Sequence, residues 1–187
     1  MMMRLRKTRP ARLILVIATL ALAMAVSVPV LADESVTQSV EGGDRSASVS
    51  GVDLGTVEYS HETQTSSGSI SLLVDDSTGS DAGWNVTLQA SHFTDGDRVI
   101  DSSNFAIVDA GNPQHRAGQE IDPENGPKIP SSGGSGSLDV PRKVLHANEG
   151  FGKGTYSQDL DVELLVPGQT LAGNYGASLT VDITAGP

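Results

Sequence analysis

The stretch Gly83-Trp84-Asn85-Val86-Thr87-Leu88-Gln89-Ala90 contains the only tryptophan of the 187-residue chain. From Trp84 onward, apolar side chains occupy every second position and Asn85, Thr87 and Gln89 lie between them, which is typical of a strand with one buried face. An indole ring contributes more buried area than the other side chains here, so we expect Trp84 to point into the core and to organise the neighbouring strands. The three polar residues then face outward, where they are available as polar contacts.

Further strands are predicted on both sides of this stretch. Alternation of apolar and polar residues predicts strands at residues 69–74, 159–166 and 175–184, and shorter ones at 54–59, 105–108 and 143–147, with polar loops such as 61–68 between them. Asp95-Gly96 predicts a turn after Phe93. No stretch after residue 32 predicts an amphipathic helix of useful length. We therefore expect an all-β fold, a single-domain antiparallel β-sandwich.

The chain divides into three segments of different composition. Five basic residues without an acid, an apolar run over residues 13–31 and the small residues before Ala32 predict a secretory signal peptide at residues 1–32; an uncleaved membrane anchor is the alternative. Residues 33–48 are predicted to be a flexible leader, and residues 49–187 the folded domain. Within the domain, the Gly, Pro and Ser content of residues 111–141 predicts a long surface loop with a mobile tip.

Charge excludes several classes of partner. Removal of residues 1–32 leaves seven basic residues against 23 acidic ones, a net charge of −16. Such a protein repels nucleic acid and anionic lipid surfaces, so neither is expected as a partner. No second apolar span is present, so no membrane span is expected after signal cleavage. The chain has no cysteine, and the core must therefore hold by burial and hydrogen bonding without disulfides.

The sequence from Phe151 onward resembles the WxL-domain proteins exported to the surface of Gram-positive bacteria. That family has a Trp-x-Leu motif in an early strand and a distal motif near its end. Here the early motif reads Trp84-Asn85-Val86, with valine in place of leucine. The distal motif keeps the family spacing and replaces its tryptophan by valine; it consists of Tyr175, Leu179-Thr180-Val181, Ile183 and Pro187.

The resemblance implies non-covalent attachment to the peptidoglycan of the cell wall, often beside a WxL-interacting surface protein. The candidate binding residues are those of the two motifs, and each of them is equally a candidate for the structural core: Trp84, Asn85, Val86, Tyr175, Leu179 and Val181.

Other chemistry is weakly supported by the residues. The four histidines lie far apart without metal-ligand spacing, so no zinc site or cofactor is expected. Two groups of aspartates leave a calcium site open, although neither has the EF-hand spacing and solvated turn carboxylates explain them as well; these groups are Asp75, Asp76 and Asp81, and Asp95, Asp97 and Asp101. No serine, histidine or carboxylate pattern indicates an active site, so we expect no catalysis.

Two functions follow as hypotheses. The first is a non-catalytic, secreted surface protein that attaches non-covalently to cell-wall peptidoglycan. The second is a structural subunit of a surface layer or fibre, which associates through strand edges.

Overall fold

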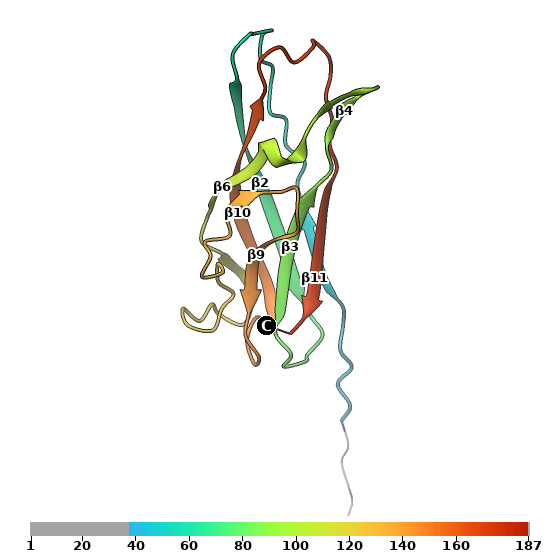
Figure 1. The fold of residues 1–187 in the computed structure, drawn as a ribbon. Helices are drawn as coiled ribbons and strands as arrows, with labels where there is room; N and C mark the ends of the chain where they lie inside the picture. The colour runs from blue at the N-terminus through green and yellow to red at the C-terminus, as the bar shows by residue number, and fades with distance from the viewer. Residues whose placement is uncertain (1–37, 187) are drawn as a thin grey trace, which may run out of the picture. The chain divides into compact units, whose positions relative to one another are not determined.

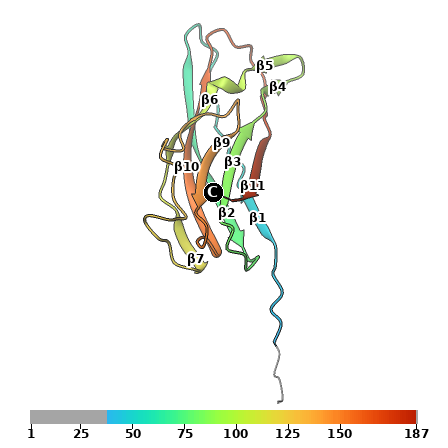
Figure 2. The same ribbon diagram turned by 60° about the horizontal axis from the view of Figure 1, so that its bottom comes forward.

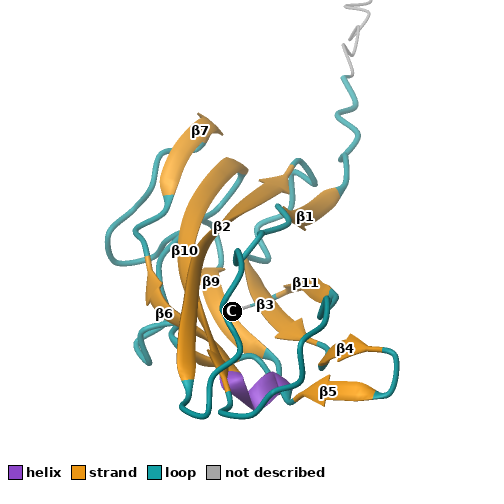
Figure 3. Cartoon of the chain, turned by 90° about the horizontal axis from the view of Figure 1, so that it is seen from above, coloured by secondary structure: helices purple, strands orange, loops and turns teal. Residues whose placement is uncertain are grey.

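A computed structural model describes residues 38–186, so the expected signal peptide, the first five residues of the expected leader (33–37) and Pro187 lie outside the described residues. The compact unit begins at Ser39. Its strands form two facing antiparallel layers, seen end-on in Figure 3, which confirms the all-β sandwich. Within residues 38–186 the single helical element is a short 3-10 turn, η1 (Ser102–Asn104).

The larger sheet has the strand order β1-β2-β10-β6-β8, and β7 pairs with residues 154–157 of β10, next to the part of β10 that pairs with β6. Its central strands β2 (Gln64–Asp76) and β10 (Gly154–Val166) pair along nearly their whole lengths, from Thr155 opposite Asp75 to Val166 opposite Gln64. The flanking strands are β1 (Arg45–Val49), β6 (Phe105–Ala110), β7 (Gln114–Gly118) and β8 (Gly136–Ser137).

The smaller sheet has the order β11-β3-β9 and contains the tryptophan stretch at its centre (Figure 1). Its strands are β3 (Trp84–Ala90), β9 (Arg142–Ala147) and β11 (Leu179–Ala185). A hairpin of β4 (Phe93–Asp95) and β5 (Arg98–Ile100) continues beyond β3, with the predicted turn at Gly96. Figure 2 shows this hairpin and β7 at opposite ends of the domain.

The core lies between the two sheets and is built by the alternation that predicted the strands. Ile70, Leu72 and Val74 from β2 are fully buried, as are Trp84 and Val86 from β3. The other buried apolar side chains of the two layers include Leu88, Phe105, Ile107, Leu145, Tyr156, Leu160, Val162 and Leu164. Burial of this apolar surface is the main contribution to stability in a chain without cysteine.

Several sequence predictions were wrong in their boundaries. The first strand is β1 (Arg45–Val49), so regular structure begins within the segment assigned to a flexible leader. Residues 54–59 form no strand, whereas residues 64–68, predicted to be loop, belong to β2. The last strand begins at Leu179 and not near Tyr175.

The segment 111–141 is also corrected. It contains β7 and β8, and Leu138 within it is fully buried, so it is not one long structureless loop. Leu138 is held in place by the backbone, because its N–H donates to the Phe105 carbonyl and its carbonyl accepts from the Ala90 N–H. The proline and glycine content of segment 111–141 produces turns between its short paired strands.

Candidate functional site

Trp84 is a core residue. Its ring is fully buried and lies beside Tyr156, with 6.2 Å between the ring centroids. Its indole Nε1 donates to the carbonyl of Gly152 at 2.9 Å. A Cβ on Gly152 would lie 2.6 Å from that Nε1, and this residue has a φ of +81°, so only glycine fits here. The expected inward orientation of Trp84 is confirmed, and its ring faces are closed to a sugar.

The two sequence motifs lie on neighbouring strands. β11 pairs with β3 such that Val181 is opposite Leu88 and Ile183 is opposite Val86. The distal motif thus lies on the edge strand β11 of the sheet whose central strand, β3, carries the tryptophan motif. Leu179, Val181 and Ile183 are partly buried and pack against the core.

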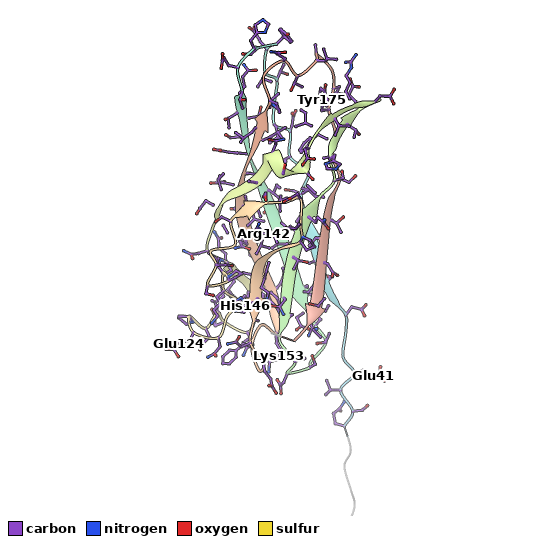
Figure 4. All side chains as sticks on the ribbon, viewed as in Figure 1. Glu41, Glu124, Arg142, His146, Lys153 and Tyr175 are labelled. Carbon is purple, nitrogen blue, oxygen red and sulfur yellow. The ribbon has the colours of Figure 1, made fainter. Side chains whose placement is uncertain are left out.

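The aromatic residues of the two motifs lie at opposite ends of the smaller sheet. Trp84 pairs with Ala185 at one end, whereas Thr94 bridges to Gly176, beside Tyr175, at the other. The ten-residue extended path from Trp84 to Thr94 spans roughly 33 Å. Figure 4 shows Tyr175 far from Lys153, which is adjacent to the Trp84 partner Gly152. Trp84 and Tyr175 therefore do not share one ring-sized ligand.

The outer face of the smaller sheet is polar, as the alternation predicted. Asn85 lies between Thr184 and His146, and Thr87 lies between Asp182 and Lys143. The Asn85 amide donates to the Gly186 carbonyl, and its Oδ1 is buried without a hydrogen-bond partner among the described residues. Among the described residues, this face holds charges of both signs and the imidazole of His146, so it offers mainly polar contacts.

The surroundings of His146 disfavour its charged form. Burial, and next the positive charges of Lys128 and Lys143, lower the pKa of His146 below its ordinary value. The His146 backbone is fixed because its N–H donates to the Lys128 carbonyl and its carbonyl accepts from the Lys128 N–H.

A cavity of about 670 Å³ lies at the Tyr175 end of the domain. One wall is the irregular segment 49–60, and the other is the connection between β10 and β11 at residues 170–177. Its floor is apolar and includes Phe93, Ile100, Phe105, Leu164 and Val166. We call this cavity the end groove. Its volume lies within the range of ligand-binding pockets, about 300 to 1,000 Å³.

Both walls of the end groove are held by the rest of the fold. Arg98 of the β4–β5 hairpin donates to the Ala172 carbonyl at 2.5 Å, and the Tyr175 hydroxyl donates to the Leu171 carbonyl at 2.9 Å. On the other wall, Val52 packs directly over β2, since a Cβ on Gly68 would lie 2.5 Å from its Cγ2. The groove is therefore shaped before any ligand arrives.

The model of one protein family, described as WxL domain surface cell wall-binding, matches residues 37–187. The chain belongs to this WxL family. It is accordingly a surface protein with a cell-wall-binding domain, and the match covers both sheets and the end groove. A search of curated proteins gave no match.

The WxL domain presents two of the expected motif residues at the end groove. Tyr175 and Leu179 line it, whereas Trp84, Asn85, Val86 and Val181 do not. Sequence reasoning missed most of the groove, in particular residues 49–60, which it placed at the start of the folded domain with a strand at 54–59. The signal that could have indicated this wall is the low periodicity of residues 50–56 between two strands, a feature typical of an irregular covering segment.

Two of the candidate calcium ligands of the WxL domain, Asp75 and Asp76, are engaged within the protein. Asp76 is buried, pairs with Arg45 at 2.9 Å and accepts from Thr78. Asp75 accepts from Ser77 and Thr155. Within residues 38–186 no three acidic or histidine side chains are grouped to hold a metal ion. In the same range, no helix has the length and hydropathy to span a bilayer.

Proposed function

We propose that this protein is a secreted, non-catalytic surface protein of a Gram-positive bacterium, and that its WxL domain attaches non-covalently to peptidoglycan at the end groove. The observation that carries the proposal is the family match over residues 37–187, whose description is surface cell wall-binding. The end groove supports it as the place of contact, because it is concave, partly apolar and fixed by the fold.

The charge of the protein determines how this attachment works. With a net charge of −16 after removal of the proposed signal peptide, long-range attraction does not bring the protein to an anionic wall. Binding therefore depends on local polar and apolar contacts, which are weakly screened by salt.

Co-sedimentation with purified peptidoglycan sacculi tests the proposal. The chain lacking residues 1–32 keeps every described residue and is incubated with sacculi at low and at moderate salt. We expect saturable recovery in the pellet at both salt concentrations. Complete recovery in the supernatant at both would refute attachment to peptidoglycan.

A second candidate function, assembly through a strand edge, is favoured by β11. The Gly186 N–H donates to the Gly83 carbonyl, and the Ser91 N–H donates to the Ser178 carbonyl. The backbone N–H and C=O groups of the even-numbered residues of β11 therefore point toward β3. The backbone N–H and C=O groups of Leu179, Val181 and Ile183 then point away from β3. β1 lies beside β11 but does not pair with it in the described chain. Such an edge suits strand addition by a second copy or by a WxL-interacting protein.

A proline substitution separates this candidate from the first. Val181→Pro removes an N–H that points outward, whereas Thr180→Pro removes one that pairs with β3. If β11 mediates assembly, Val181→Pro reduces the oligomer seen by analytical ultracentrifugation and retains the fold. A wild-type chain that stays monomeric at high concentration contradicts self-assembly, and Thr180→Pro serves as the unfolding control.

A further inference from the structure

We infer that the end groove binds the uncharged, N-acetylated glycan backbone of the cell wall, and neither its stem peptides nor its phosphate-containing polymers. This inference rests on the proposed attachment to peptidoglycan and names the part of the polymer that is recognised. It follows from the charges that line the groove, the distribution of its polar and apolar groups, and the exposed side chains at its rim.

The charges of the groove disfavour an anionic ligand. Among the residues that line it, the charged ones are Asp53 and Glu58, both acidic. The neighbouring Arg98 lies outside the lining and is occupied by Asp95 and the Ala172 carbonyl. Recognition of phosphate or carboxylate groups in proteins relies on arginine and lysine side chains or on helix N-termini. The described lining offers none of these, so a neutral ligand suits it best.

The polar groups of the groove suit hydroxyl and acetamide groups. Within the described chain, the backbone amides of residues 52–54 and 56–59 make no hydrogen bond to the rest of the domain, and Gly55 donates only to the nearby Asp53 carboxylate. Peptide groups are strong donors and acceptors that require partners whenever water is displaced. A sugar chain along this wall would supply such partners at each residue.

The apolar groups of the groove suit the carbon faces and methyl groups of N-acetylated sugars. Phe93 and Phe105 pack edge to face on the floor, with 5.2 Å between their centroids. At the rim, Tyr59 is 58% exposed and Leu171 is 59% exposed. An exposed tyrosine with a polar hydroxyl is suited to an amphipathic surface such as a sugar ring. The groove therefore offers both polar and apolar groups, as an acetylated glycan does.

Titration of the soluble chain tests the inference without a wall preparation, and a release assay from sacculi complements it. The chain lacking residues 1–32 is titrated by NMR with an uncharged oligomer of N-acetylglucosamine, with a synthetic stem peptide and with a poly(glycerol phosphate). We expect the oligosaccharide alone to shift signals of residues that line the groove. It should also release the protein from sacculi, which the other two probes should not do.

Variants at the rim locate the contact. Tyr59→Ala and Leu171→Ala should each weaken oligosaccharide binding about fivefold or more, whereas Val140→Ala should not change it. Val140 is similarly exposed, at 51%, and does not line the groove. All three substitutions lie at the surface, and unchanged unfolding midpoints show that the fold is retained.

The possible results separate the inference from the proposed function. Absence of oligosaccharide binding, or release by the stem peptide or the phosphate polymer, overturns the inference even if sacculi retain the protein. Failure to bind sacculi refutes the proposed function instead. Oligosaccharide binding that the rim variants leave unchanged overturns the assignment of the groove.

Discussion

Replacement of Trp84 by alanine tests the structural role of the tryptophan motif. The side chain is fully buried, packs on Tyr156 and donates one hydrogen bond to the Gly152 carbonyl. Removal of a buried large aromatic costs about 3 to 5 kcal/mol of unfolding free energy. We expect a loss of this size for Trp84→Ala, which is a large fraction of the roughly 5 to 15 kcal/mol of a typical domain.

A phenylalanine at the same position separates the hydrogen bond from the packing. Trp84→Phe retains an aromatic ring but leaves the Gly152 carbonyl without its donor, at a cost of about 1 to 3 kcal/mol. The loss should therefore lie below that of alanine. The difference between the two variants reports the packing of the aromatic ring that phenylalanine retains.

Urea unfolding followed by far-UV circular dichroism measures both losses. Fluorescence does not serve for the variants, because Trp84 is the only tryptophan in the chain. The midpoint should shift while the slope with urea stays constant. A loss below about 1 kcal/mol for Trp84→Ala would refute the buried position of the ring. Loss of wall retention in this variant has no functional meaning unless the midpoint is unchanged.

Three further predictions concern buried polar groups. Arg45→Ala leaves the carboxylate of buried Asp76 without its ion pair, so we expect a loss of about 3 to 5 kcal/mol in urea unfolding; a loss near zero would show that β1 adds little to the sheet. Burial, followed by the charges of Asp76 and Glu120, raises the pKa of Tyr156 to about 12, so its contribution to stability is complete below pH 10 and is lost as the pH rises through 12. Absorbance titration should show a late phenolate step that Tyr156→Phe removes, and a step near pH 10 contradicts burial. The lowered pKa of His146 makes its neutral form the stabilising one, so stability should fall as the pH drops below about 6.5, and His146→Gln should reduce this dependence in thermal unfolding.

The parts of the fold that could be predicted are those where one sheet face is buried. Trp84, Val86 and Leu88 alternate with polar residues, and the same pattern marks Ile70 to Val74 and Leu160 to Leu164. The turn at Asp95-Gly96 was also predicted correctly, because a glycine with φ of +61° follows the aspartate. Local periodicity and turn chemistry were sufficient for these elements.

The remaining elements depend on long-range contacts that periodicity does not encode. The polar residues 64–68 form a strand because β10 supplies hydrogen-bond partners along their whole length. In β9, a register shift opposite Val86 and Thr87 turns both Val144 and Leu145 inward, so strict alternation assigns only one of them to the core. Residues 111–141 are ordered by pairing with β10, β6 and β9, through pairs such as Lys128 with His146 and Ser137 with Ala106 that are not close in sequence.

The candidate site was predictable only in part for a related reason. Spacing identified Tyr175 and Leu179, which line the end groove, but it also selected Trp84 and Val181, which belong to the sheet. A concave surface is formed by segments that meet in space, here residues 49–60 and 170–177. The family motifs thus mark the sheet that supports the groove more than the groove itself.

Blocking the end groove tests the central claim most directly. Gly176 lines the groove, and no atom lies within 4 Å of the position that a Cβ would take there. Wild type, Gly176→Ala and Gly176→Trp are compared by co-sedimentation with sacculi at equal unfolding midpoints. We expect alanine to retain binding and tryptophan to abolish most of it. Equal retention of all three proteins would contradict attachment through this groove.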